Sequence, residues 1–100
     1  MAKAKILVID DEDEIRKITV KFLEKNGNYE IFQAANGREG IKMFESHHPD
    51  IVITDLNMPG IRGEEVVRHI RNKTTRILQI FFIYNPSSPY NFLICFQRLQ

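Results

Sequence analysis

The stretch Ile51-Val-Ile-Thr-Asp55-Leu-Asn-Met-Pro-Gly60 decides the fold, because an apolar run ends there in an acid and a loop. Its apolar and β-branched residues predict a strand that is buried on both faces, and the proline and glycine break any regular continuation. A second run of this kind, Lys5-Ile-Leu-Val-Ile9, ends in Asp10 and Asp11. Two buried strands that both end in carboxylates predict a parallel sheet with helices on its two sides.

Amphipathic segments separate these strands. The residues Ile15, Ile18, Phe22 and Leu23 recur at helical spacing, which predicts the inner face of a helix that ends at Asn26-Gly-Asn28. A strand over residues 29–34 then precedes a helix that Asn36 can cap, with Ile41 and Phe44 on the inner face of that helix.

The pattern continues beyond Gly60. Val66, Val67 and Ile70 predict a third helix, and residues 77–83 predict a fourth strand. Strands and helices therefore alternate. This order predicts an α/β fold of three layers, in which a doubly wound parallel sheet lies between two layers of helices.

Composition predicts a single domain that spans residues 1–100, since a chain of this length with 43% hydrophobic residues suffices for a single compact core. The one cysteine, Cys95, excludes an intramolecular disulfide, so we expect a cytoplasmic protein. All thirteen acidic residues lie at or before Glu65. We interpret the basic residues between 68 and 76 as a solvated helix end and not as a nucleic-acid surface.

Asp10, Asp11 and Asp55 follow the first and third strands, which are neighbours in a doubly wound sheet. Ligands of such sheets bind beyond the carboxyl ends of the strands, so we expect the three carboxylates to converge. Like charges at short range repel unless a cation joins them, and Mg²⁺ prefers oxygen ligands. The sequence therefore predicts a Mg²⁺ site, whereas the acids at 12–14 need no role beyond favouring a helix start.

Two segments, Ile6-Leu-Val-Ile-Asp10-Asp11 and Ile51-Val-Ile-Thr-Asp55-Leu-Asn57-Met-Pro-Gly60, resemble the acidic motifs of response-regulator receiver domains. The resemblance extends through Asn36-Gly-Arg-Glu-Gly-Ile41 and Gly63-Glu-Glu-Val66. It covers about residues 1–75, and residues 76–100 are atypical. It implies the flavodoxin-like fold of that family.

The resemblance also implies a function in two-component signalling. It implies that Asp55 accepts a phosphoryl group from a sensor histidine kinase or phosphotransfer protein in a Mg²⁺-dependent phosphorelay. It further implies that Asp10, Asp11, Asp55 and the main-chain carbonyl of Asn57 bind Mg²⁺. Such a domain is a phosphoacceptor that catalyses only its own phosphorylation and dephosphorylation, and by itself it binds neither nucleic acid nor a membrane.

The chain departs from the family pattern after Lys73. The family has a Ser or Thr at the end of the fourth strand and a Lys at the end of the fifth, but Tyr84 takes the first position here and no lysine follows Lys73. These departures favour an alternative, a degenerate receiver that serves as an interaction or dimerisation module. A flavin- or nucleotide-binding enzyme is disfavoured, because the loop after the first strand is acidic where a phosphate cradle is needed.

The C-terminal segment allows two interpretations. Four residues repeat at helical spacing: Phe92, Cys95, Phe96 and Leu99. With Ser88-Pro89 as a helix start, we favour a helix over residues 89–99; the alternative is a strand, which would have to pair antiparallel because the preceding link is short. Both lack the family's regular fifth strand and last helix. We therefore expect a truncated or frame-altered C-terminus, and a homodimer or segment-exchanged oligomer formed through this tail.

Overall fold

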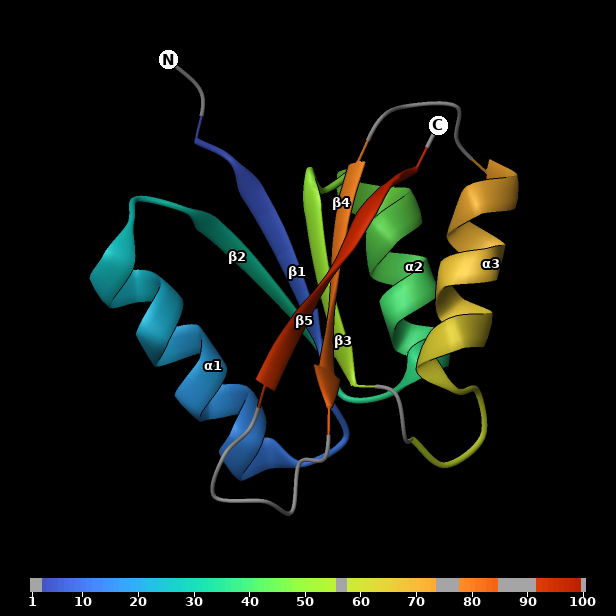
Figure 1. Cartoon of the computed structure of the whole chain (residues 1–100), viewed down its shortest axis with the longest axis horizontal. Coiled ribbons are helices and arrows are strands. Elements are labelled where there is room, and N and C mark those ends of the chain that lie inside the picture. The colour runs from blue at the N-terminus through green and yellow to red at the C-terminus, as the bar shows by residue number, and fades with distance from the viewer. Residues whose placement is uncertain (1–2, 56–57, 74–77, 85–91, 100) are drawn as a thin grey trace.

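The computed structural model describes residues 3–55, 58–73, 78–84 and 92–99. One sheet of five strands in the order β2-β1-β3-β4-β5 forms its centre (Figure 1). The strands are β1 (Lys5–Ile9), β2 (Glu30–Ala34), β3 (Ile51–Asp55), β4 (Leu78–Tyr84) and β5 (Phe92–Leu99). The first four run parallel, whereas β5 pairs antiparallel with β4.

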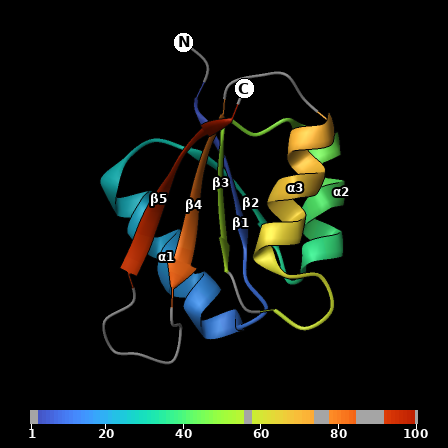
Figure 2. The same cartoon turned by 45° about the vertical axis from the view of Figure 1, so that its right-hand side comes forward.

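Helices cover the sheet from both sides. The described helices are α1 (Asp13–Asn26), α2 (Gly37–His47) and α3 (Gly63–Lys73). Helices α2 and α3 lie side by side on one face of the sheet and α1 lies on the other, as Figures 1 and 2 show together. The predicted three-layer α/β fold is therefore confirmed. Among the described helices, none combines the length and the apolar character that a membrane span requires.

Strand β1 shows why its sequence is apolar throughout. Leu7 and Ile9 are fully buried in the cluster that packs against α2 and α3, whereas Ile6 and Val8 are buried in the cluster on the α1 side. Successive side chains of a strand point to opposite faces, so a strand covered on both sides needs apolar residues at every position. This arrangement places the end of β1 inside the molecule.

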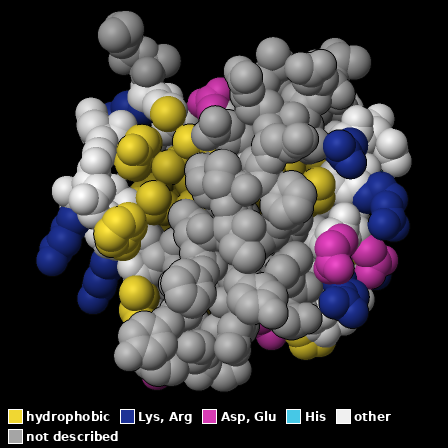
Figure 3. All heavy atoms as spheres, in the orientation of Figure 1, with side chains coloured by type: hydrophobic (Ala, Val, Ile, Leu, Met, Phe, Trp, Pro, Cys, Tyr) yellow, Lys and Arg dark blue, Asp and Glu magenta, His cyan; other side chains and the backbone are white. Residues whose placement is uncertain are grey.

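Helix α1 packs differently from the prediction. Ile15 and Leu23 are partly buried as expected, but Ile18 and Phe22 are each 63% exposed, and Val20 is the buried residue of the helix. Each residue of an α-helix advances about 100° around the axis, so Ile18 and Phe22 lie nearly opposite Val20. The prediction that Ile18 and Phe22 face inward was wrong, and hydrophobic side chains are visible on the α1 side of the surface (Figure 3).

The C-terminal segment forms a strand and not the favoured helix. Residues 92–99 pair with β4 in an antiparallel register from Tyr84↔Phe92 to Leu78↔Leu99. The helix over residues 89–99 was therefore wrong, and the alternative of an antiparallel strand is confirmed for 92–99. Backbone pairing with β4, the strand that precedes it in the chain, outweighs the local helical spacing here. The predicted helix start at Ser88-Pro89 lies outside the described residues.

Candidate functional site

The acidic residues converge because β1 and β3 are adjacent and end at the same edge of the sheet. Their parallel register pairs Ile9 with Thr54, so Asp10 and Asp55 occupy the next position on each strand. Both acids are fully buried. Asp11 is more exposed, and the ligand atoms of the three carboxylates all lie within 4.8 Å of one another. The structure thus brings together the three acids that the sequence singled out.

Hydrogen bonds fix Asp10 at three of its polar atoms. Its main-chain N–H donates to the carbonyl of Ala34 at 3.1 Å, which ties it to β2. Its carboxylate Oδ1 accepts from the main-chain N–H of Glu12 at 3.0 Å. Its carbonyl oxygen accepts from the guanidinium of Arg16 at 2.7 Å. The backbone and one carboxylate oxygen of Asp10 are therefore held in place.

The environment of Asp10 disfavours its ionised form. The pKa of the Asp10 carboxyl is raised from an ordinary value of 3.8 to about 6. Burial is the largest cause, the hydrogen bond from the Glu12 main chain acts against it, and the negative charges of Asp55, Asp11 and Glu12 add to it. Removing a carboxylate from water and placing it near like charges both destabilise the charge. A cation bound among these acids would reverse this effect.

A hard divalent cation fits this donor set. Asp10 Oδ2 and Asp11 Oδ1 are buried oxygens that accept no hydrogen bond in the structure. Buried polar atoms normally have hydrogen-bond partners, so two such oxygens beside the Asp55 carboxylate are suited to bind a cation. Oxygen-only ligation by carboxylates suits Mg²⁺ or Ca²⁺ better than softer metals. The carbonyl of Asn57, the fourth ligand that the sequence suggested, lies outside the described residues.

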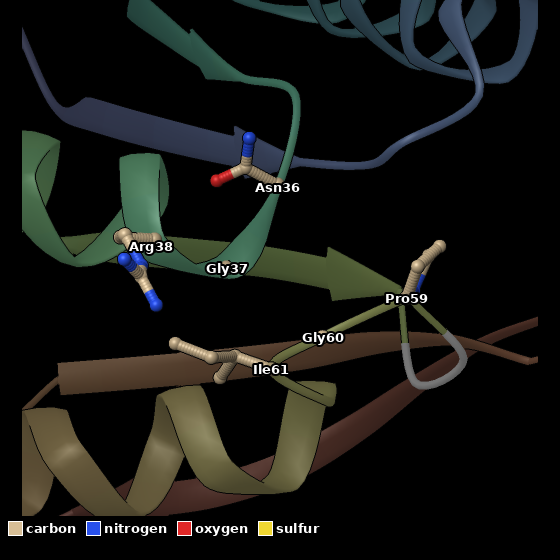
Figure 4. Close-up of a pocket in the computed structure, with 6 residues that line it drawn as sticks. All are labelled: Asn36, Gly37, Arg38, Pro59, Gly60 and Ile61. Atoms are coloured by element: carbon tan, nitrogen blue, oxygen red, sulfur yellow. The ribbon is translucent and has the colours of Figure 1, made fainter.

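A small cavity adjoins this edge of the sheet. The start of α2 and the loop after β3 line it, with the residues Asn36, Gly37, Arg38, Pro59, Gly60 and Ile61 (Figure 4). Its volume is about 280 Å³. The loops approach closely at Gly37, where a Cβ atom would lie 2.9 Å from the Ile61 main-chain oxygen. Glycine at this position therefore permits the close approach of the start of α2 to Ile61.

Sequence reasoning missed Arg16 and Gln33. The Arg16 guanidinium bonds the Asp10 carbonyl, and it also contacts the Gln33 amide oxygen at 3.2 Å and Asp13 Oδ1 at 2.6 Å. The only local signal is the spacing of three residues between Asp13 and Arg16, which allows an ion pair along a helix. The contacts with Asp10 and Gln33 depend on the tertiary fold.

The fold and the site define a class of protein: a doubly wound α/β domain with an oxygen-rich acidic site at the carboxyl edge of its strands. The sequence profile of the response regulator receiver domain matches residues 6–89. This chain belongs to the response regulator receiver family, whose members act in two-component signalling. The predicted family is therefore confirmed.

Individual relatives agree with this assignment. The chain is 46% identical over 68 residues to the CAI-1 autoinducer sensor kinase/phosphatase CqsS of Vibrio cholerae, covering 68% of this chain and 10% of that protein. It is 35% identical over 71 residues to sporulation initiation phosphotransferase F of Bacillus subtilis, covering 71% of this chain and 56% of that protein. The chain thus spans at most about half the length of these two relatives.

A solved structure adds a ligand to the comparison. Response regulator protein TrrA of Thermotoga maritima, solved in complex with Mg(2+)-BeF, is 48% identical to this chain. Its TM-score is 0.68, and the alignment covers 71% of this chain and 61% of that protein. Most of this chain therefore shares its fold with a response regulator protein that was solved in complex with Mg(2+)-BeF.

Proposed function

We propose that Asp55 accepts a phosphoryl group from a phosphohistidine of a sensor histidine kinase or phosphotransfer protein, in a reaction that requires Mg²⁺. One observation carries this proposal: three carboxylates from two neighbouring strands lie within 4.8 Å, and two of their buried oxygens accept no hydrogen bond. Asp10, Asp11 and Asp55 would hold the metal, and the resemblance to the family implies the carbonyl of Asn57 as a further ligand. The chain acts as a phosphoacceptor and catalyses only its own phosphorylation and dephosphorylation.

Phosphoryl transfer to Asp55 requires no activated nucleophile. A carboxylate oxygen of Asp55 forms a bond to phosphorus as the bond between phosphorus and the histidine nitrogen breaks, and the electron pair of that bond stays on the imidazole. Asp55 is fully buried at the end of β3, beside the carboxylates of Asp10 and Asp11. When bound, Mg²⁺ supplies the positive charge that lets a carboxylate approach an anionic phosphoryl group.

Incubation with acetyl phosphate or phosphoramidate and Mg²⁺, followed by intact mass spectrometry, tests the proposal. We expect the wild-type chain to gain one phosphoryl group, and we expect excess EDTA to abolish the gain. The Asp55→Asn variant should gain none. Glu24→Gln is the matched control, because Glu24 is an exposed acid on α1 whose substitution changes the net charge equally. Labelling of Asp55→Asn at the wild-type level would contradict the assignment of the acceptor.

A second function, self-association through β5, is favoured by the sheet topology. Strand β5 is eight residues long, forms an edge of the sheet, and has the sequence FLICFQRL with one charged residue. An apolar edge strand presents a row of backbone groups to another strand. We propose that β5 pairs with β5 of a second copy. Two antiparallel strands related by a two-fold axis satisfy such an isologous contact.

Size-exclusion chromatography and native mass spectrometry across a concentration series test this association. A lysine on an edge strand opposes strand pairing, so we expect Ile94→Lys to shift the wild-type dimer toward monomer. Phe22→Lys is the control, because it replaces an exposed apolar residue on α1 and not on β5. A wild-type chain that stays monomeric at every concentration, or a dimer that Phe22→Lys alone dissociates, would refute pairing through β5.

A further inference from the structure

Arg16 faces the sheet from the first turns of α1. It precedes the buried Val20 by four residues and therefore lies on the same side of the helix, whereas Ile18 and Phe22 point away. Its side chain is only 15% exposed. A guanidinium held so far from water needs acceptors for its donors, and the structure supplies them from three different elements.

The three acceptors lie around the turn that joins β1 to α1. Arg16 Nη1 donates to the Asp10 carbonyl at 2.7 Å, Nε donates to Gln33 Oε1 at 3.2 Å, and Nη2 donates to Asp13 Oδ1 at 2.6 Å. The bond to Asp13 fixes the side-chain rotamer within α1, and the bond to Gln33 joins α1 to β2. Because the guanidinium is fixed in this way, its bond to the Asp10 carbonyl holds the main chain of the acidic site in place.

The hydrogen bonds of Asp10 show what this contact achieves. The Asp10 N–H is bound to Ala34 and its Oδ1 to the Glu12 N–H, so the Arg16 contact occupies the remaining backbone group. Rotation of the turn would have to break bonds to β2 and to α1 together. The carboxylate atom left without a hydrogen bond, Asp10 Oδ2, is buried among the acids that converge at the site.

We propose that Arg16 is a positioning residue for the metal site: its guanidinium fixes the main chain of Asp10, so that the Asp10 and Asp11 carboxylates are preorganised for Mg²⁺. The inference rests on the proposed Mg²⁺-dependent function. Residues that orient metal ligands without touching the metal typically change metal affinity by about 10- to 100-fold when they are removed. Arg16 acts through geometry, and its charge is partly offset by Asp13.

An arginine is required by this geometry. Its planar fork offers five N–H donors in fixed directions, whereas the ammonium group of a lysine is a compact point charge on a flexible stem. A lysine at position 16 keeps the charge but cannot reach a carbonyl, an amide oxygen and a carboxylate at once. The variants Arg16→Lys and Arg16→Gln therefore separate the effect of geometry from the effect of charge.

Isothermal titration of Mg²⁺ into the full chain is the first test. We expect Arg16→Gln and Arg16→Lys each to raise the Kd for Mg²⁺ by about tenfold. Gln33→Ala, which removes one anchor of the guanidinium, should raise it by less. Lys17→Gln is the matched control, since Lys17 is an exposed neighbour on α1, and its Kd should stay within about twofold of wild type.

Amide hydrogen exchange of the metal-free chain is the second test. We expect the main-chain N–H of Glu12 to exchange faster in Arg16→Gln, while the amides of Val8 and Ile53 in the strands stay protected. A variant that lowers the Tm but leaves both the Mg²⁺ affinity and the Glu12 exchange at wild-type values shows a merely structural role and overturns the inference.

The remaining outcomes are equally decisive. Wild-type affinity in Arg16→Lys, or an equal loss in Lys17→Gln, assigns the effect to charge and also overturns the inference. Phosphoryl labelling at Asp55 together with unchanged affinity in Arg16→Gln leaves the proposed function intact and removes only the role of Arg16. A wild-type chain that neither binds Mg²⁺ nor accepts a phosphoryl group removes both.

Discussion

The two faces of the sheet are covered unequally. On one face, α2 and α3 enclose a large cluster in which Phe44, Val66 and Ile70 are buried against β1, β3 and β4. On the other face, α1 contributes Val20 as its one buried residue, while Ile18 and Phe22 stay largely exposed. Among the residues whose side chains the structure describes, the larger buried cluster therefore lies on the α2 and α3 side.

The acidic site lies at the junction of these two regions. Asp10 and Asp11 belong to the turn that leads into α1, whereas Asp55 ends β3, the strand that precedes α3. We therefore expect stability and metal affinity to respond to different substitutions. The apolar cluster on one side supports the sheet, whereas polar contacts of α1 orient two of the acids.

Replacing a phenylalanine by alanine on each side should give the largest difference in the free energy of unfolding. Phe44 of α2 is 4% exposed and Phe22 of α1 is 63% exposed, so the same substitution removes buried area only in the first case. We expect Phe44→Ala to lower the free energy of unfolding by about 4 kcal/mol. Phe22→Ala should change it by less than about 0.5 kcal/mol. Urea denaturation followed by circular dichroism measures both, and equal losses would end the distinction between the two faces.

The charge of Asp10 should give the next largest effect. Because the folded-state pKa of about 6 exceeds the ordinary 3.8, the folded chain holds the Asp10 proton more tightly than the unfolded chain does. The corresponding stability is present at low pH and is lost as the pH rises through about 6. Relative to Asp10→Asn, the metal-free wild type should lose about 2 kcal/mol between about pH 4 and about pH 7.5.

Magnesium provides the control for this pH effect. Metal binding favours the ionised carboxylate, so saturating Mg²⁺ should raise the Tm of the wild type near neutral pH, and EDTA should remove the gain. The Asp10→Asn variant should show little of that gain. A difference between wild type and Asp10→Asn that is independent of pH would mean that Asp10 is not buried in its neutral form. Thermal melts with and without the metal make the comparison.

Sequence alone predicted the better-packed side with most of its detail. The apolar runs 6–9 and 51–53 become the buried parts of β1 and β3, and Asn36 precedes a helix whose Phe44 is buried, so local pattern and tertiary structure agree there. The convergence of Asp10, Asp11 and Asp55 also followed, because the carboxyl ends of adjacent parallel strands meet at one edge.

The other region could not be predicted to the same depth. Helix α1 has apolar residues at positions 15, 18, 20, 22 and 23, which form two overlapping stripes, and only packing on the sheet selects the stripe that contains Val20. The helical spacing of residues 92–99 favoured a helix, but a short apolar run also fits a strand because it carries no decisive period. The role of Arg16 depends on Gln33, a partner 17 residues away that no local pattern indicates.

Close packing beside α2 predicts a smaller effect at a glycine. A Cβ at Gly37 would lie 2.9 Å from backbone and side-chain atoms of Ile61 and from Val66 Cγ2, so the loop would have to move. We expect Gly37→Ala to destabilise the fold by about 1 to 2 kcal/mol. A Cβ at Gly60 meets no atom within 4 Å, although the positive φ of 82° disfavours other residues. Gly60→Ala should therefore cost about 1 kcal/mol through backbone conformation alone.

Chemical denaturation separates these two glycine effects when it is combined with a second substitution at each site. Asparagine tolerates a positive φ better than alanine, so Gly60→Asn should recover part of the loss, whereas Gly37→Asn should be worse than Gly37→Ala. Recovery at position 37 would show that the contact with Ile61 relaxes easily. The close approach of the two loops beside the acidic site would then contribute little.

Substitutions at the first residues of α1 and α2 should give the smallest difference in the free energy of unfolding. The Asn36 side chain accepts a hydrogen bond from the Glu39 main-chain N–H at 2.8 Å, and Glu39 in turn accepts from the Ala35 N–H at 3.2 Å, which caps α2 reciprocally. Glu12 stands at the start of α1 and makes no side-chain cap. We expect Asn36→Ala to lower the free energy of unfolding by about 1 kcal/mol.

Glu12→Ala should leave stability unchanged within about 0.5 kcal/mol, because it removes no cap. Its charge also raises the pKa of Asp10, so its loss slightly favours the ionised site in the metal-free chain. Denaturation midpoints of the two variants, measured at one pH in EDTA, compare the helices directly. If Glu12→Ala destabilised as much as Asn36→Ala, the start of α1 would be held as firmly as that of α2, and the polar contacts of Arg16 would not be needed to orient the acidic turn.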